Sequence, residues 1–119
     1  MKKTLIIGAS PDASRYAYKA AHMLTRFSHE IVNVGIKSGE VAGVGIEKQG
    51  AVYKDIDTIT LYIGPALQPQ YYDYIIDTKP KRVIFNPGTE NYEFEKLLDK
   101  HNIEPMRACT LVLLSTGQY

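Results

Sequence analysis

Ser10 and Arg15 are the side chains near the start of the chain that are best suited to chemistry, because both can hold a phosphate. They follow the apolar run Leu5-Ile6-Ile7 and the turn former Gly8. A serine hydroxyl can donate a hydrogen bond to a phosphate, and a guanidinium adds charge-assisted ones. Free N–H groups at the start of a following helix also attract anions. The spacing predicts a phosphate site; the alternative is that Ser10 or Ser14 caps the helix and Arg15 is solvated.

Lys37 is the second cation placed to meet a ligand. It follows the β-rich segment 30–36, where an NAD-binding unit carries an acidic residue for the ribose hydroxyls. A lysine at this place disfavours NAD and suits a phosphorylated ribose, as in coenzyme A (CoA) or NADP. The alternative is a surface lysine without a ligand, because exposed lysines are common.

Residues for catalysis or metal binding are few. The three histidines lack metal-ligand spacing, and the chain has neither a Gly-x-Ser-x-Gly elbow nor a Walker motif. Cys109 is the only cysteine, which excludes a disulfide framework or a Cys-rich zinc site. We therefore predict no catalytic set and no metal site. We expect Cys109 to be a buried small hydrophobe before an apolar strand; the alternative is a reactive thiol that faces the ligand.

Strand-like and helix-like segments alternate along the chain. Short β-rich runs predict strands, and apolar residues at three- and four-residue intervals predict amphipathic helices. The predicted strands are 5–7, 30–36, 58–63, 82–85, 104–106 and 111–114, with a short one around 51–53, and the predicted helices are 14–27, 68–77 and 90–101, the last with Thr89 as N-cap. This alternation predicts an α/β fold: a three-layer, Rossmann-like, doubly wound domain with a mostly parallel sheet of about five strands.

Glycine-containing loops follow these predicted strands. In doubly wound sheets, ligands bind beyond the carboxyl ends of the strands, at the switch point in strand order. Glycine allows the backbone to approach a ligand closely. We therefore expect the site to be formed by the loops 8–14, 35–39, 64–65 and 86–88. The literal Gly-x-Gly at 43–45 lacks a third glycine and a strong strand-to-helix pattern, so we exclude it.

The size and charge of the chain bound the other possibilities. Its 119 residues, 14 of them basic and 13 acidic, predict one domain over residues 1–119. They disfavour a nucleic-acid partner, which normally requires a basic excess. The N-terminal apolar run is too short for a signal sequence and no run approaches a membrane span, so we expect a cytoplasmic protein without membrane contact. The tyrosine-rich predicted helix 68–77 suggests a surface for a homodimer or a protein partner.

Taken together, these segments resemble a known family. The matching stretches are Ile7-Gly8-Ala9-Ser10 with Arg15 to Ala20, Glu30 to Val34 with Lys37 and Gly43, Thr60 to Ile63, Phe85 to Asn91, and Met106 to Leu111. Their order and spacing resemble the small stand-alone CoA-binding proteins, whose domain is also the N-terminal domain of succinyl-CoA synthetase α subunits. The resemblance covers nearly the whole chain. It implies a Rossmann-like CoA-binding fold in a cytosolic protein with no assigned reaction.

The resemblance also implies how the ligand lies. It places the CoA phosphates on the first loop, the adenosine end between the loops after Val34 and Ile63, and the pantetheine arm near Pro87 and Gly88. Lys37 would lie toward the 3′-phosphate. The complete predicted cofactor site is Gly8, Ala9, Ser10, Arg15, Val34, Lys37, Ile63, Gly64, Pro65, Asn86, Pro87 and Gly88.

The function favoured by these residues is the binding of coenzyme A or an acyl-CoA, and an enzyme is the less favoured class because no catalytic set is present. Two alternatives remain. One is a small NADP-binding oxidoreductase, since Lys37 also suits a 2′-phosphate. The other is a protein-interaction module with a vestigial nucleotide site, which the tyrosine-rich helix 68–77 favours.

Overall fold

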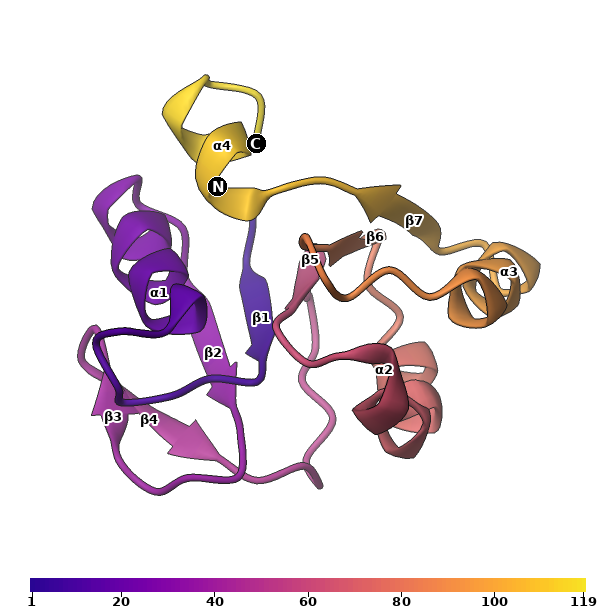
Figure 1. Cartoon of the computed structure of the whole chain (residues 1–119), viewed down its shortest axis with the longest axis horizontal. Helices are drawn as coiled ribbons and strands as arrows, with labels where there is room; N and C mark the ends of the chain where they lie inside the picture. Colours follow the sequence, from indigo (N-terminus) through magenta and orange to yellow (C-terminus); the bar gives the residue numbers. More distant parts are fainter.

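A seven-stranded sheet runs through the middle of the molecule in the computed structural model, which describes residues 1–119 (Figure 1). The strands lie in the order β3-β4-β2-β1-β5-β6-β7, and all neighbours are parallel except β3 and β4. Their bounds are β1 Thr4–Ile7, β2 Ile31–Val34, β3 Glu40–Val41, β4 Val44–Glu47, β5 Thr58–Leu61, β6 Arg82–Phe85 and β7 Glu104–Arg107. Without β3 this is the order of a doubly wound Rossmann sheet. The predicted fold class is confirmed, with seven strands rather than about five.

Helices cover both faces of the sheet, two on each (Figure 1). One face carries α1 and α4, and the other carries α2 and α3, which gives the predicted three layers. The bounds are α1 Tyr16–Arg26, α2 Tyr72–Thr78, α3 Tyr92–Lys100 and α4 Thr110–Ser115, with two 3-10 turns before α2, η1 Pro65–Leu67 and η2 Pro69–Tyr71. None of these helices combines the length and apolar character that crossing a membrane requires.

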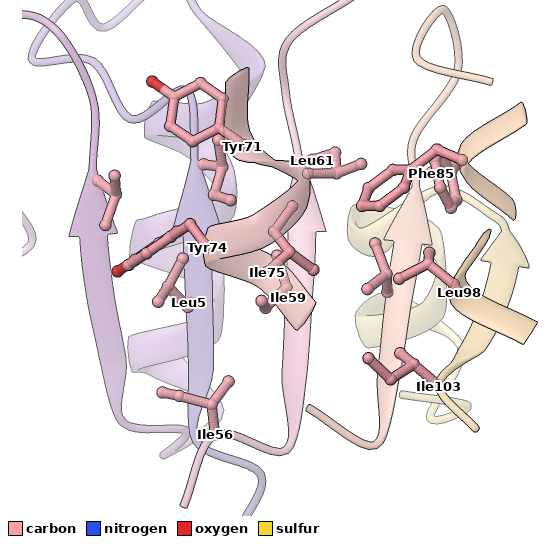
Figure 2. Close-up of a cluster of buried hydrophobic side chains, with 14 of the residues drawn as sticks. Leu5, Ile56, Ile59, Leu61, Tyr71, Tyr74, Ile75, Phe85, Leu98 and Ile103 are labelled. Atoms are coloured by element: carbon pink, nitrogen blue, oxygen red, sulfur yellow. The ribbon is translucent and has the colours of Figure 1, made fainter. Parts of the chain in front are cut away.

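Apolar side chains hold the helices on the sheet. Strands β1, β2, β5 and β6 are buried along their whole length, as expected for parallel strands covered on both faces. Figure 2 shows Ile75 of α2 and Leu98 of α3 in the cluster that packs on these strands. Phe94 of α3 adds ring contacts, with centroids 5.9 Å from Phe85 and 4.1 Å from Tyr72. Burial of each such side chain stabilises the fold by ~1.5–3 kcal/mol.

The segment between β2 and β5 differs from the prediction. It forms the β3–β4 hairpin, and no strand forms around residues 51–53. Ala42 and Gly43 have positive φ, at 53° and 78°, as tight two-residue hairpin turns require. The Asn33 side-chain amide donates to one carbonyl of β3 at 3.2 Å and to one of β4 at 3.1 Å. This side chain fastens the hairpin to β2, a contact that local sequence does not reveal.

The segment 111–114, predicted as a strand, is part of helix α4. Thr110 and Leu114, four residues apart, are the buried residues of this helix. The Thr110 hydroxyl forms a hydrogen bond with the Thr60 hydroxyl of β5 at 2.8 Å. A short apolar run cannot by itself distinguish a strand from a buried helix. The contact with β5 favours the helix here.

All three predicted helices begin later than expected, and α1 starts at residue 16 rather than 14. Helix α3 starts after Asn91, whose side chain accepts a hydrogen bond from the Phe94 amide at 3.1 Å. The prediction of Thr89 as N-cap is therefore wrong: this residue is buried, and its hydroxyl donates to the Asn86 carbonyl at 2.8 Å. The predicted helix 68–77 is regular α-helix only from residue 72 onward, because the preceding residues form the turns η1 and η2.

Candidate functional site

A cleft of about 770 Å³, called the main cleft below, opens at the carboxyl ends of β1, β2, β5 and β6. It lies at the switch point, where β1 and β5 are neighbours and their chain connections leave in opposite directions. Each of the four loops predicted to form the site contributes to its wall. The predicted residues that line it are Gly8, Ala9, Ser10, Arg15, Lys37, Ile63, Gly64, Pro87 and Gly88.

Gly8 allows two loops to meet at the floor of the main cleft. Its φ is +94°, and a Cβ at this position would lie 2.8 Å from the carbonyl oxygen of Tyr62. The amides of Gly8 and Ala9 both donate to the Val34 carbonyl, at 2.9 and 3.0 Å. These two amides are engaged within the protein, so the donors for a ligand come from elsewhere. A larger residue at position 8 would strain the backbone and displace the neighbouring loop.

Ser10, Asp12 and Ser14 stabilise the loop between β1 and α1. The Ser10 hydroxyl oxygen accepts from the Asp12 amide at 3.1 Å, which leaves its O–H free to donate. The Asp12 carboxylate accepts from the amide and the hydroxyl of Ser14, at 2.9 and 2.7 Å. These two bonds lower the pKa of Asp12, and the charges of Arg15 and Lys37 lower it further. The loop therefore has a defined shape before any ligand arrives.

The N-terminus of α1 has no side-chain cap. Arg15 is the N-cap residue, with extended backbone and no capping hydrogen bond from its side chain. The alternative prediction, that Ser10 or Ser14 caps this helix, is wrong. The backbone amides of Tyr16, Ala17 and Tyr18 have no hydrogen-bond partner. Tyr16 and Ala17 also line the main cleft. Such free amides, together with the positive end of the helix dipole, favour an anion.

Two cations and one carboxylate make up the charge of the main cleft. Arg15 lies 3.9 Å from Asp12, and both side chains are largely exposed, so this pair contributes little to stability. Lys37 lines the cleft and forms no ion pair. The two cations together exceed the one carboxylate, which favours an anionic ligand.

Asn86 stabilises the wall of the main cleft through buried hydrogen bonds. It is buried, and its side-chain amide donates to the Thr60 hydroxyl and the Leu61 carbonyl, at 2.7 and 2.8 Å. Its side-chain oxygen accepts from the Thr110 amide at 2.9 Å. This one side chain joins β5, β6 and α4. Its loss would leave several buried polar groups without partners, which costs about 1–3 kcal/mol each.

Gln68 joins the loops after β5 and β6. It is fully buried, and its amide donates to the carbonyls of Ile63 and Thr89, at 3.0 and 2.7 Å. Its oxygen accepts from Asn91 at 2.9 Å. Gln68 was not predicted, since its partners lie up to 23 positions away in sequence and no local signal points to them.

Three predicted residues do not line the main cleft. Val34 is buried in β2 and supplies the carbonyl that holds the first loop. Pro65 starts η1 and is exposed. Asn86 forms the buried hydrogen bonds described above. They were included in the predicted site because it was assigned by loops, and each of them is next to a residue that does line the cleft.

Eight residues that line the main cleft are absent from the predicted site, and three of them, Asp12, Tyr16 and Tyr62, carry side chains able to contact a ligand through a polar group or a ring. Asp12 lies in a predicted loop, but a carboxylate was not counted as a phosphate ligand. Tyr16 was assigned to the apolar face of the first helix, yet 66% of it is exposed. Tyr62 was placed inside the predicted strand 58–63, whereas β5 ends one residue before it.

A side pocket of about 260 Å³ adjoins the main cleft. Tyr16, Tyr62 and Pro87 line both spaces, so the side pocket lies directly beside the main cleft. Its complete lining is Tyr16, Tyr62, Asn86, Pro87, Cys109 and Leu111. Cys109 differs from the prediction: it is only partly buried, and it is the residue before helix α4 rather than before a strand.

Tyr62 lines both spaces, and its hydroxyl is buried near those of Thr60 and Thr110. No hydrogen bond satisfies this hydroxyl within the protein. Burial raises the pKa of Tyr62 to about 12, and the nearby hydroxyls of Thr110 and Thr60 lower it by less. The side chain therefore stays protonated at neutral pH and keeps a hydrogen to donate.

Residues 2–115 match the model of the family described as CoA binding domain. Comparison with curated proteins gives no match.

Several solved structures share the fold. One, described only as an uncharacterized protein, is 54% identical, with a TM-score of 0.98 over 100% of this chain and 98% of its own. A hypothetical protein from Pyrococcus horikoshii OT3 is 25% identical, with a TM-score of 0.87 over 97% of this chain and 82% of its own. A protein from Thermus thermophilus shares the fold at 19% identity and a TM-score of 0.87, over 99% of this chain and 90% of its own.

Proposed function

The chain belongs to the CoA-binding domain family, and from this premise we propose that it binds coenzyme A or an acyl-CoA in the main cleft. The observation that carries the proposal is the uncapped N-terminus of α1, which faces the same cleft as Arg15 and Lys37. Free amides and two cations form a site for phosphates. CoA carries a pyrophosphate and a separate 3′-phosphate, so it can use both parts of this site.

In the proposed complex the pyrophosphate lies at the start of α1. The amides of Tyr16 and Ala17, the Ser10 hydroxyl and the Arg15 guanidinium donate to it. The adenosine lies between the loops after β2 and β5, and its 3′-phosphate is bound by Lys37. The pantetheine arm then runs toward the turn after β6.

The proposal is for binding rather than for a reaction. The ionisable side chains in the wall of the main cleft are one carboxylate, two cations and two tyrosines, and neither histidine nor cysteine is among them. Those carboxylate and cationic groups lie at the phosphate end of the proposed complex. The groups of this wall are therefore suited to holding a ligand.

The two alternatives differ in what they require of the cleft. An NADP site would use the same Lys37, so a direct titration is needed to separate it from CoA. A vestigial site in an interaction module would be filled by its own side chains, whereas this cleft is open. In the segment 68–77, Tyr71 and Tyr74 are buried in the core and Tyr72 stacks on Phe94. A homodimer or protein partner at this helix stays a prediction.

Isothermal titration calorimetry with CoA, dephospho-CoA and NADPH tests the proposal. We expect saturable binding of CoA to one site and binding of dephospho-CoA that is about tenfold weaker, the size of one charge-assisted hydrogen bond. NADPH should bind more weakly than CoA. Absence of CoA binding up to millimolar concentration would contradict the proposal, and tighter binding of NADPH would favour the oxidoreductase alternative.

A further inference from the structure

We propose that the side pocket holds a short, uncharged acyl group, so that the preferred ligand is a short-chain acyl-CoA rather than free CoA. This inference rests on the proposed function, because the acyl group can reach the pocket only at the end of a bound pantetheine arm. Four features of the pocket support it: its position, its lining, its size and one buried hydroxyl.

The position of the pocket matches the end of the proposed ligand. Pro87 belongs to the turn toward which the pantetheine arm runs, and it lines both the main cleft and the side pocket. Tyr16 and Tyr62 complete the shared boundary. A chain that follows the main cleft from the start of α1 to this turn therefore ends at the entrance of the side pocket.

The lining of the pocket excludes charge. No lysine, arginine, histidine, aspartate or glutamate is among its residues. The Asn86 amide is already committed to Thr60 and Leu61, and its oxygen to the Thr110 amide. An acyl group with its own carboxylate would lie here without a cation to pair with, which is unfavourable. An aliphatic acyl group would meet mostly apolar atoms.

The volume of the pocket limits the chain length. At roughly 30 Å³ for each heavy atom, the value for a molecule of liquid water, about 260 Å³ holds fewer than about nine heavy atoms. The thioester itself occupies part of this space. Acyl groups of a few carbons fill this space, and a fatty acyl chain would extend beyond it.

The Tyr62 hydroxyl supplies the polar contact that a thioester needs. It is buried and makes no hydrogen bond within the protein, and the Tyr62 side chain lines both the cleft and the pocket. A buried hydroxyl without a partner is unfavourable, and a thioester carbonyl oxygen placed there would accept its hydrogen. Because burial raises the pKa of Tyr62 to about 12, the donor persists across the neutral range.

Calorimetric titrations with CoA, butyryl-CoA, succinyl-CoA and palmitoyl-CoA test the inference. We expect butyryl-CoA to bind about tenfold more tightly than CoA, from the burial of its methylene groups. Succinyl-CoA and palmitoyl-CoA should bind no better than CoA. If CoA binds and all three thioesters match it, this inference fails and the proposed function stands. If neither CoA nor any thioester binds, both fail.

Three variants separate the hydroxyl and the pocket from general effects on the fold. Tyr62→Phe should reduce the ratio of the affinities for butyryl-CoA and CoA at least threefold, because the hydrogen bond to the thioester is lost and CoA has no thioester. Tyr74→Phe removes the other buried tyrosine hydroxyl without a partner, which lies in α2. It should change the affinity for neither CoA nor butyryl-CoA. Leu111→Trp fills the pocket and should abolish the preference while CoA still binds. An undiminished preference in Leu111→Trp would overturn the inference.

Discussion

Arg82 and Arg15 have the same side chain at opposite ends of the sheet, in contrasting surroundings. Arg82, at the amino end of β6, is 8% exposed. It donates to the Thr58 hydroxyl at 2.8 Å and to the Tyr119 carbonyl at 3.0 Å, and its guanidinium lies 4.6 Å from the Tyr119 ring centre. The Arg15 side chain, beyond the carboxyl end of β1, is 66% exposed and has one weak contact, with Asp12 at 3.9 Å.

The contrast extends to the groups around each arginine. At the amino end, Lys2 also donates to the Tyr119 carbonyl, and its amide donates to His29 Nδ1 at 3.0 Å. At the carboxyl end, the first amides of α1 and the Tyr62 hydroxyl have no partners. Polar groups that are fully bonded stabilise the fold, and groups that are left without partners need an explanation such as a ligand. The polar groups at the amino end therefore bond within the protein, whereas those at the carboxyl end are free to contact the proposed ligand.

Arg82→Met should have the largest effect on stability. It leaves two buried acceptors each with one hydrogen-bond partner fewer and removes the cation–π contact with the Tyr119 ring, so the free energy of unfolding should fall by about 3 kcal/mol. Urea denaturation followed by circular dichroism measures this change. Arg15→Met, the same exchange at the other end, is the control and should stay within about 0.5 kcal/mol of the parent. Equal losses at both positions would contradict the comparison.

Arg15→Met should have the largest effect on binding. It removes a charge-assisted contact to the proposed pyrophosphate, so CoA should bind tenfold to a hundredfold more weakly, or about 1.5–3 kcal/mol. Calorimetry on both arginine variants measures this under conditions in which each is folded. Arg82→Met should keep the affinity of the parent. CoA binding that depends on Arg82 and not on Arg15 would reverse the assignment of the two ends.

Lys37→Ala should have a smaller and ligand-specific effect. Its ammonium is proposed to meet the 3′-phosphate, so the variant should bind CoA about tenfold more weakly and dephospho-CoA with unchanged affinity. Lys100→Ala, an exposed lysine at the end of α3, is the matched control and should bind both ligands as the parent does. A Lys37→Ala variant with unchanged CoA affinity would show that the adenosine end lies elsewhere.

His29 should give the smallest effect, a pH dependence confined to the amino end. Partial burial and the neighbouring positive charges lower the pKa of this side chain below its unfolded value of 6.5. The unfolded chain then binds more protons, so the contribution of His29 is present above pH 6.5 and declines as the pH falls below it. Denaturation at pH 7.5 and 5.5, compared with His29→Gln, should show a smaller pH-dependent loss in the variant. An identical loss would exclude His29 as its source.

The parts of the fold that follow from local sequence were predicted well. The apolar runs of β1, β5 and β6 and the apolar spacing of α1 are visible within each segment. The residues of each segment alone therefore indicate whether it is a strand or a helix. The loops of the site were predicted for the same reason, since they begin where those runs end. Ser10, Arg15 and Lys37 line the main cleft, and they could be named in advance because cations and hydroxyls that follow a strand are a local signal.

The parts that depend on distant partners could not be predicted. Helix α4 was mistaken for a strand because only its contact with Thr60 distinguishes the two. Asn91 rather than Thr89 caps α3, because the Thr89 hydroxyl donates to the Asn86 carbonyl and Thr89 lines the cleft. Tyr62 and Gln68 become important through neighbours on other loops, and neither has a local pattern that sets it apart.

A titration of the 15N-labelled protein with CoA, followed by backbone amide chemical shifts, tests most directly the claim that the two ends of the sheet have different roles. We predict saturable shifts of the amides of Gly8, Tyr16, Ala17 and Gly88 at the carboxyl end. The chemical shifts of the Arg82 and Tyr119 amides should not change. Shifts concentrated at the amino end, or none up to millimolar CoA, would contradict this claim.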